Sequence, residues 1–228
     1  MSQISEVHNI DCMEYMRGLP DKFFELAIVD PPYGLKHGSR GNGDYVRRTL
    51  KYTSKTDKKW DENIPNRKYF KELFRVSQNQ IIWGANYMVE HIPASMGWIC
   101  WYKSDEIKGR DFSECEFAFS SFDKAARHFD CKPFIKKIDR IHSTQKPIVL
   151  YKWLLQNYAK QGDKILDTHL GSGSSRIAAF DMGFDFYATE LDKDYYEAQE
   201  KRFKEHCIAH GNVLFKPERQ VIQQQKLL

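Results

Sequence analysis

Residues 164–175 read KILDTHLGSGSS, in which an apolar run ends on Asp167 and passes through a glycine-rich turn into a helical stretch. Gly171 and Gly173 let the backbone of such a turn approach a ligand closely, and the following helix offers free N–H groups in its first turn. The turn lacks the lysine of a phosphate-gripping loop. Arg176 also stands where a dinucleotide-binding turn has its third glycine. The stretch therefore predicts a strand, turn and helix that cradle a ligand other than a pyrophosphate.

The next expected strand, at residues 185–189, ends on an acid that fits a nucleoside site. Glu190 lies seventeen residues past Gly173, and a carboxylate placed there can accept both hydroxyl groups of a ribose. The two features together fit a nucleoside whose other end is not a pyrophosphate. A glycine turn that only caps a helix would explain the same residues, so both interpretations stay open at this point.

Short apolar runs alternate with helical stretches along the rest of the chain, which is typical of a parallel sheet flanked by helices. We predict an α/β fold in which one sheet contains seven strands, at residues 7–10, 25–30, 79–83, 97–102, 116–120, 164–167 and 185–189. Helices are predicted at residues 12–18, 67–76, 147–160, 174–182 and 193–206. We expect a single domain over residues 1–215, followed by a glutamine-rich tail at residues 216–228.

Two segments, 35–65 and 104–141, interrupt this alternation and are predicted to be insertions at the working edge of the sheet. Residues 36–59 contain eight basic and two acidic residues, a local charge of +6 in a chain whose net charge is +4. A basic segment with mobile glycines suits a polyanion such as nucleic acid, although a solvated surface loop would look the same. The predicted nucleic-acid contacts are Lys36, Arg40, Arg47, Arg48, Lys51, Lys55, Lys58 and Lys59.

A second stiff turn, Asp30-Pro31-Pro32-Tyr33 or DPPY, follows the apolar run at residues 24–29. The two prolines lock their φ angles, so the turn presents the Asp30 carboxylate and the Tyr33 ring in a preset arrangement. A strand-ending turn with a helix-capping aspartate is the structural alternative for the same four residues.

Taken together, these segments resemble the S-adenosylmethionine-dependent amino-methyltransferases of DNA. The DPPY turn stands as their catalytic tetrapeptide, and residues 167–173 resemble their cofactor loop except at Thr168, His169 and Leu170. HSTQKP at residues 142–147 resembles the segment that holds the methionine end of the cofactor. The DPPY turn precedes the glycine loop, which is the permuted motif order of the beta group. The resemblance therefore implies a Rossmann-like class I methyltransferase fold with helices on both faces of a mostly parallel sheet.

The resemblance also implies the reaction. A methyl group would pass from S-adenosylmethionine to the N6 amine of adenine in double-stranded DNA, by direct attack of a base flipped out of the duplex. Asp30 and the Pro31 carbonyl would accept the two amine hydrogens. Pro32 would stiffen the turn, and Tyr33 would stack on the base. Asp at position 30 favours adenine N6 over cytosine N4. The alternatives are a cytosine-N4 or RNA amine methyltransferase and a non-catalytic nucleic-acid-binding protein.

Cofactor contacts are implied residue by residue. They are Asp11, Cys12, Asp30, His142, Thr144, Lys146, Asp167, Leu170, Gly171, Gly173, Ser174, Glu190 and Leu191. Thr144 and Lys146 would bind the cofactor carboxylate, unless they lie in a solvated loop. Asp11 would accept from the adenine amine of the cofactor, but it is equally placed to cap the helix at residues 12–18.

The remaining expectations concern partners and location. Five cysteines without a CxxC pair signal neither a disulfide framework nor a zinc site, so no metal is expected. No apolar run approaches the roughly 20 residues that span a bilayer, and the amino terminus lacks a basic start before an apolar stretch. We therefore expect a cytoplasmic protein without a membrane partner. The resemblance implies duplex DNA as the partner and residues 104–141 as the target-recognition segment, and it makes a homodimer or a companion restriction enzyme plausible.

Overall fold

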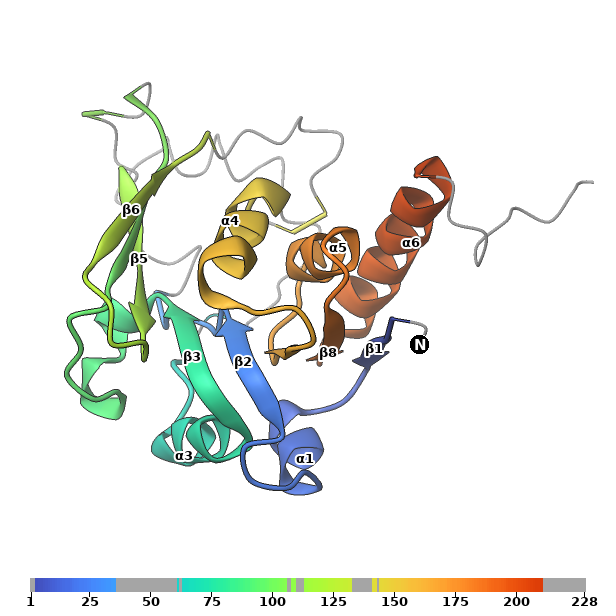
Figure 1. Cartoon of the computed structure of the whole chain (residues 1–228), viewed down its shortest axis with the longest axis horizontal. Helices are drawn as coiled ribbons and strands as arrows, with labels where there is room; N and C mark the ends of the chain where they lie inside the picture. The colour runs from blue at the N-terminus through green and yellow to red at the C-terminus, as the bar shows by residue number, and fades with distance from the viewer. Residues whose placement is uncertain are drawn as a thin grey trace, which may run out of the picture.

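The computed structural model describes residues 3–35, 61, 63–105, 108–109, 113–132, 141–142 and 144–210, which form an eight-stranded sheet covered by helices (Figure 1). The strands are β1 (Ser5–His8), β2 (Phe24–Val29), β3 (Ser77–Trp83), β4 (Ile99–Tyr102), β5 (Cys115–Ser120), β6 (Arg127–Asp130), β7 (Lys164–Asp167) and β8 (Asp185–Thr189). Their order across the sheet is β1-β8-β7-β2-β3-β5-β4-β6. Neighbouring strands are parallel except where β5 pairs with β3 and with β4. The mostly parallel sheet predicted from the sequence is confirmed.

The sheet has one strand more than the seven that the sequence predicts. The additional strand, β6, lies at the edge of the sheet and pairs in parallel with β4. Three of its four residues are polar and exposed, and Phe129 is half-buried. The apolar alternation that would reveal a strand is therefore lacking in this stretch.

The predicted strands lie within two residues of the observed ones. In β1 the pairing with β8 runs from Ser5 opposite Phe186 to His8 opposite Thr189, whereas the sequence predicts residues 7–10. This edge strand is only partly buried, so its apolar residues mark its position weakly.

All five predicted helices are confirmed, with ends that differ by three residues at most. They are α1 (Cys12–Arg17), α3 (Arg67–Val76), α4 (Ile148–Tyr158), α5 (Ser174–Asp181) and α6 (Lys193–Ala209), and two short 3₁₀ turns, η1 (Ala85–Tyr87) and η2 (Val89–His91), follow β3. Three helices begin at side-chain caps, because Asp11, Asn66 and Asp192 accept the first backbone N–H groups of α1, α3 and α6. Within the described residues, none of the helices has the length and apolar character needed to cross a membrane.

Helices cover both faces of the sheet, as the sequence predicts (Figure 1). Leu26 and Ile28 of β2 belong to the hydrophobic cluster that contains residues of α4 and α5. Ala27 and Val29 belong to the second cluster, with residues of α1 and α3. The alternation follows from the two-residue period of a strand. Because β2 is buried on both faces, the turn that follows it starts from a rigid base.

The segment 104–141 is partly sheet and partly connection. β5 and β6 lie within it, and β5 is an inner strand between β3 and β4, because its residues Ala118 and Phe119 are buried in the two opposite clusters. Residues 106–107, 110–112 and 133–140 of this segment lie outside the described residues, so its role as an insertion stays a prediction. Most of the other predicted insertion, residues 36–60 and 62, lies outside the described residues, as does the tail.

The chain leaves two neighbouring strands in opposite directions. β7 connects through α5 to β8 on one side, whereas β2 connects through α3 to β3 on the other. Open α/β sheets bind ligands in the crevice that such a divergence creates at the carboxyl ends of the strands. The DPPY turn follows β2 and the glycine loop follows β7. The topology therefore places both predicted motifs at this crevice, although they are far apart in the sequence.

Candidate active site

The DPPY turn brings the Asp30 carboxylate and the Tyr33 hydroxyl into contact at the carboxyl end of β2. The Tyr33 hydroxyl donates to Asp30 Oδ1 at 2.6 Å. The backbone N–H groups of Tyr33 and Gly34 both donate to Oδ1 of the buried Asp61, at 2.8 and 3.1 Å. Asp61 thus fixes the turn, and the chain that connects Gly34 to Asp61 starts and ends beside it.

Gly84, directly after β3, makes room for the Tyr33 ring. A Cβ atom at position 84 would lie 2.1 Å from that ring, and the backbone φ of Gly84 is +65°, a left-handed conformation that favours glycine. The ring of Tyr87 in η1 also stacks against Tyr33, with the ring centroids 5.5 Å apart. Tyr87 is 42% exposed, so this aromatic pair extends from the carboxylate toward the surface.

Lys146 reaches the same carboxylate from the segment before α4. Its ammonium nitrogen lies 2.5 Å from Asp30 Oδ2 and 3.0 Å from the Tyr33 hydroxyl. The same nitrogen lies 3.2 Å from Oε2 of Glu116, whose Oε1 lies 2.6 Å from Lys103 Nζ. Both oxygens of Asp30 therefore have partners within the chain. The lysine predicted to bind the cofactor carboxylate is paired here with two protein carboxylates.

The charges of this cluster stabilise one another in a buried setting. Burial favours the neutral amine of Lys146, but Asp30 and Glu116 outweigh burial and raise the pKa of the lysine. Burial likewise raises the pKa of Asp30, against the opposing effect of Lys146. Burial also works against the charge of Glu116, yet Lys146 and Lys103 lower its pKa to about 2. The cluster thus holds a cation between an ionised glutamate and the Asp30 carboxylate.

Two acids, Asp167 and Glu190, organise the glycine loop after β7. Asp167 accepts from the His169 backbone N–H at 3.0 Å and from the Ser175 hydroxyl at 2.6 Å, and burial raises its pKa to about 7. Glu190 accepts from the Gly171 backbone N–H at 2.8 Å, which ties the loop to the end of β8. The predicted cofactor loop and the predicted ribose acid are therefore in direct contact.

The other predicted cofactor residues lie near these acids or at the end of β1. Asp11 Oδ1 accepts two backbone N–H groups of α1, at 2.8 and 3.2 Å, so the capping alternative is confirmed, while its contact with a cofactor stays a prediction. Cys12 follows it, and burial raises the pKa of its thiol to about 12. In and beside the loop, Leu170 and Ser174 are buried, whereas Leu191 is exposed.

The described residues His142 and 144–146 lie between the glycine loop and the DPPY turn. The His142 ring lies beside Gly171, where an added Cβ would be 3.5 Å from the ring, and the Thr144 hydroxyl lies 3.1 Å from His142 Nδ1. The Gln145 side chain is buried, and its Oε1 accepts a backbone N–H at 3.0 Å, but its amide nitrogen has no hydrogen-bond partner among the described residues. This segment joins the two halves of the candidate site and leaves one buried donor unused.

Burial of His169 in the loop makes stability depend on pH. It lowers the pKa of the imidazole from 6.5 to about 4, so between these values the unfolded chain binds a proton that the folded chain does not. The contribution of His169 to the free energy of unfolding therefore falls as the pH falls through this window, whereas the raised pKa of Asp167 acts in the opposite direction. We expect His169→Gln to remove this loss, which is at most about 3 kcal/mol. Urea unfolding of the wild type and of His169→Gln at about pH 7.5 and about pH 4.5 measures the change in the free energy of unfolding between the two pH values. An equal change in both proteins would contradict this prediction.

Several residues that surround the two motifs are absent from the sequence prediction. Glu116 and the Trp83 ring, whose centroid is 5.3 Å from Lys146 Nζ, contact the lysine, and Lys103 contacts Glu116. The sequence contains one indication of Glu116, because it is an acidic residue within an otherwise largely apolar predicted strand. The predicted nucleic-acid contacts at residues 36–59 lie outside the described residues.

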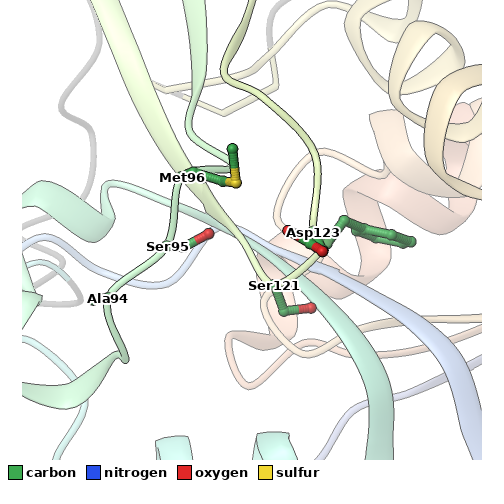
Figure 2. Close-up of a pocket in the computed structure, with 6 residues that line it drawn as sticks. Ala94, Ser95, Met96, Ser121 and Asp123 are labelled. Carbon is green, nitrogen blue, oxygen red and sulfur yellow. The ribbon is translucent and has the colours of Figure 1, made fainter.

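The structure also contains a hollow of about 540 Å³, whose lining residues are drawn in Figure 2. It is lined by Ala94, Ser95, Met96, Ser121, Phe122 and Asp123. Because β5 runs antiparallel to β3 and its last residue, Ser120, pairs with Ile81, the chain after Ser120 runs away from the carboxyl end of β3. None of the residues that line the hollow belongs to the DPPY turn, the glycine loop or the segment before α4. The hollow is therefore not part of the candidate active site. The described part of the chain contains no group of three or more His, Cys, Asp or Glu side chains arranged to hold a metal ion.

Comparisons with known proteins give the family of the chain and similar folds. A model of the N6 and N4 methyltransferases, described as DNA methylase, matches residues 42–201. The chain is 21% identical over 249 residues to the Type II methyltransferase M1.MboII of Moraxella bovis, with 86% of this chain and 95% of that protein covered. Its fold is similar to that of the M1.HpyAVI–SAM complex, with a TM-score of 0.56 and 19% identity over 86% of this chain and 98% of that one. It is also similar to the cytosine-N4-specific PvuII DNA methyltransferase, with a TM-score of 0.57 and 10% identity over 93% of this chain and 94% of that one.

Proposed function

The chain belongs to the DNA methylase family of N6 and N4 methyltransferases, and from this premise we propose that it transfers a methyl group from S-adenosylmethionine to the N6 amine of adenine in double-stranded DNA. The observation that carries the proposal is the position of the two motifs. Asp30 of the DPPY turn follows β2, and the glycine loop follows β7, the neighbouring strand in the sheet. A ligand in the glycine loop would therefore face Asp30 across the junction of these two strands.

The groups around the glycine loop suit S-adenosylmethionine, which when bound supplies an electrophilic methyl group on a sulfonium. Glu190 is the acid for the ribose hydroxyls and orders the loop through Gly171. The buried amide nitrogen of Gln145 has no partner among the described residues, and a buried N–H donor of this kind suits the cofactor carboxylate. We therefore propose that Gln145 and Thr144 bind the cofactor carboxylate, and that Lys146 pairs with Asp30 instead.

The target amine would take the place of chain partners on Asp30. An exocyclic base amine is a weak nucleophile, because its lone pair is delocalised into the ring. Asp30 and the Pro31 carbonyl would accept its two N–H bonds and hold the nitrogen out of that conjugation, in a geometry that the prolines preset. The negative charge of Asp30 would also stabilise the positive charge that grows on the nitrogen.

The aromatic pair and the basic segment suit a flipped base and the surrounding DNA backbone. Tyr33 and Tyr87 stack beside the Asp30 carboxylate, and aromatic rings of this kind can hold a base that has rotated out of the duplex. Residues 36–59 carry a charge of +6 and connect Gly34 to Asp61 beside the DPPY turn. Their lysines and arginines would bind DNA phosphates next to the flipped base.

Nucleoside analysis tests the proposal against its alternatives. The purified protein and S-adenosylmethionine are incubated with DNA from a methylation-deficient host, and the digested nucleosides are identified by mass spectrometry. We expect N6-methyladenine. N4-methylcytosine would favour the cytosine alternative, which the matched family also includes. If the protein binds the cofactor but leaves the DNA unmethylated, the remaining alternatives are an RNA amine methyltransferase and a non-catalytic nucleic-acid-binding protein.

A further inference from the structure

We propose that Glu116, itself held by Lys103, is a positioning residue that receives the Lys146 ammonium when the target amine displaces it from Asp30. This inference rests on the proposed methyl transfer to a base amine and names a residue that the DPPY turn and the glycine loop do not include. The step is an exchange of hydrogen bonds, in which no covalent bond forms or breaks.

Asp30 is not free to accept an amine in the structure. Its Oδ1 accepts from the Tyr33 hydroxyl at 2.6 Å, and its Oδ2 accepts from Lys146 Nζ at 2.5 Å. A base amine that donates to Asp30 must therefore displace at least one of these two partners. The ammonium is the partner that also opposes the reaction, because its positive charge lies next to a nitrogen on which positive charge grows.

Among the described residues, Glu116 gives the displaced ammonium a carboxylate partner that it already contacts. The Lys146 side chain is 2% exposed, and its nitrogen lies 5.5 Å from the Tyr33 ring centroid and 5.3 Å from the Trp83 ring centroid. Leaving its carboxylate partners would place an unpaired charge in a buried site, which is costly. Glu116 Oε2 is already 3.2 Å away, so a short movement of the ammonium keeps it paired.

Glu116 is held in place to act as this acceptor. It lies on the inner strand β5, opposite Trp101 of β4, and Lys103 Nζ lies 2.6 Å from its Oε1. Lys103 is in turn fixed by its backbone N–H, which donates to the Glu114 carbonyl at 2.9 Å. The two lysines balance the charges of Asp30 and Glu116. Moving the ammonium between the carboxylates therefore changes no net charge in the cluster.

The test compares Glu116→Gln with the wild type and with Lys152→Met. Glutamine keeps the size of the side chain but removes the charge that draws Lys146 away from Asp30. Lys152→Met is the matched control, because it removes a lysine that lies 2.7 Å from a carboxylate, Asp181, outside the site. The measurements are the single-turnover rate of methyl transfer to DNA at saturating cofactor, and the Kd for S-adenosylmethionine by calorimetry.

We expect Glu116→Gln to lower the single-turnover rate by about 10- to 100-fold, since an ammonium retained on Asp30 competes with the amine. We expect its cofactor Kd to stay within about twofold of the wild type, because Glu116 contacts Lys146 and Lys103 rather than the loop. Glu116→Asp keeps the charge and should recover part of the rate. It also keeps the inference testable if the glutamine variant fails to fold.

A wild-type rate in Glu116→Gln would overturn the inference. A raised cofactor Kd with an unchanged rate at saturating cofactor would overturn it as well, since Glu116 would then serve the cofactor. If Glu116→Gln does not fold and Glu116→Asp does, the aspartate variant alone decides. A single-turnover rate below about a thousandth of the wild-type rate in Glu116→Asp would then contradict the inference. A wild type that binds cofactor but methylates no DNA would overturn the proposed function itself, which separates the two failures.

Discussion

Replacing Asp30 with alanine is expected to lower the rate of methyl transfer by about 10³-fold, because the target amine loses the acceptor that orients it and stabilises its growing charge. Cofactor binding should persist, since the glycine loop is held by Asp167 and Glu190 rather than by Asp30. The chain should also fold, because Lys146 keeps Glu116 as a carboxylate partner. The rate is measured with saturating labelled cofactor, and cofactor binding is measured by calorimetry.

Asp21→Ala is the control for the loss of one carboxylate. Asp21 lies in an exposed turn and pairs with Arg75 at 2.8 Å, away from both motifs. This variant should transfer methyl groups at the wild-type rate. If Asp30→Ala kept more than about a tenth of the wild-type rate, the assignment of Asp30 as the catalytic carboxylate would be wrong.

Gly84→Ala should produce the second large effect, through the position of the Tyr33 ring. The new Cβ would lie 2.1 Å from that ring, so the ring must move, and the residue would keep a φ of +65°. The left-handed conformation and the overlap together should lower the free energy of unfolding by about 3 kcal/mol. Because the Tyr33 ring is proposed to hold the target base, moving it should lower the rate of methyl transfer by about 10²-fold.

Gly183→Ala separates these two contributions. Gly183 also has a positive φ, +77°, but a Cβ there would meet the Gln161 side chain at an ordinary distance of 3.6 Å. This variant should show the conformational cost alone, about 1 kcal/mol, with an unchanged rate. Urea unfolding and single-turnover kinetics are measured for both variants. Equal rates of methyl transfer in the two variants would show that the close contact between the Tyr33 ring and Gly84 is unimportant for transfer.

Much of the fold follows from local sequence patterns. The run at residues 24–29 is strongly apolar and is followed closely by two prolines, and the strand at residues 164–167 is followed closely by two glycines. The position and type of these two strands are therefore clear. The edge strand β6 is polar on its exposed residues and has no such pattern. A polar edge strand such as β6 is therefore not revealed by its own sequence pattern, because only its pairing with β4 identifies it.

The two motifs of the site could be predicted, but not what surrounds them. Asp30 and the glycine loop are recognisable because each lies within a few residues of its own strand. The pairing of Lys146 with Asp30 joins residues 116 positions apart, and Glu116 reaches the lysine from an antiparallel strand. Such contacts depend on the order of strands in the sheet. Lys146, in the segment that resembles the one holding the methionine end of the cofactor, was therefore predicted to bind the cofactor carboxylate, whereas the structure pairs it with the DPPY carboxylate.

We propose that the crevice at the carboxyl ends of β2 and β7 holds the reaction in which a methyl group passes from S-adenosylmethionine to DNA. The most direct measurement incubates the protein with methyl-labelled cofactor and an equimolar mixture of DNA from a methylation-deficient host and cellular RNA, and then counts the label in each fraction. We predict label in the DNA with the wild-type protein, and background counts with Asp30→Ala. Label in the RNA alone, or none in either fraction while the cofactor is bound, would contradict the account.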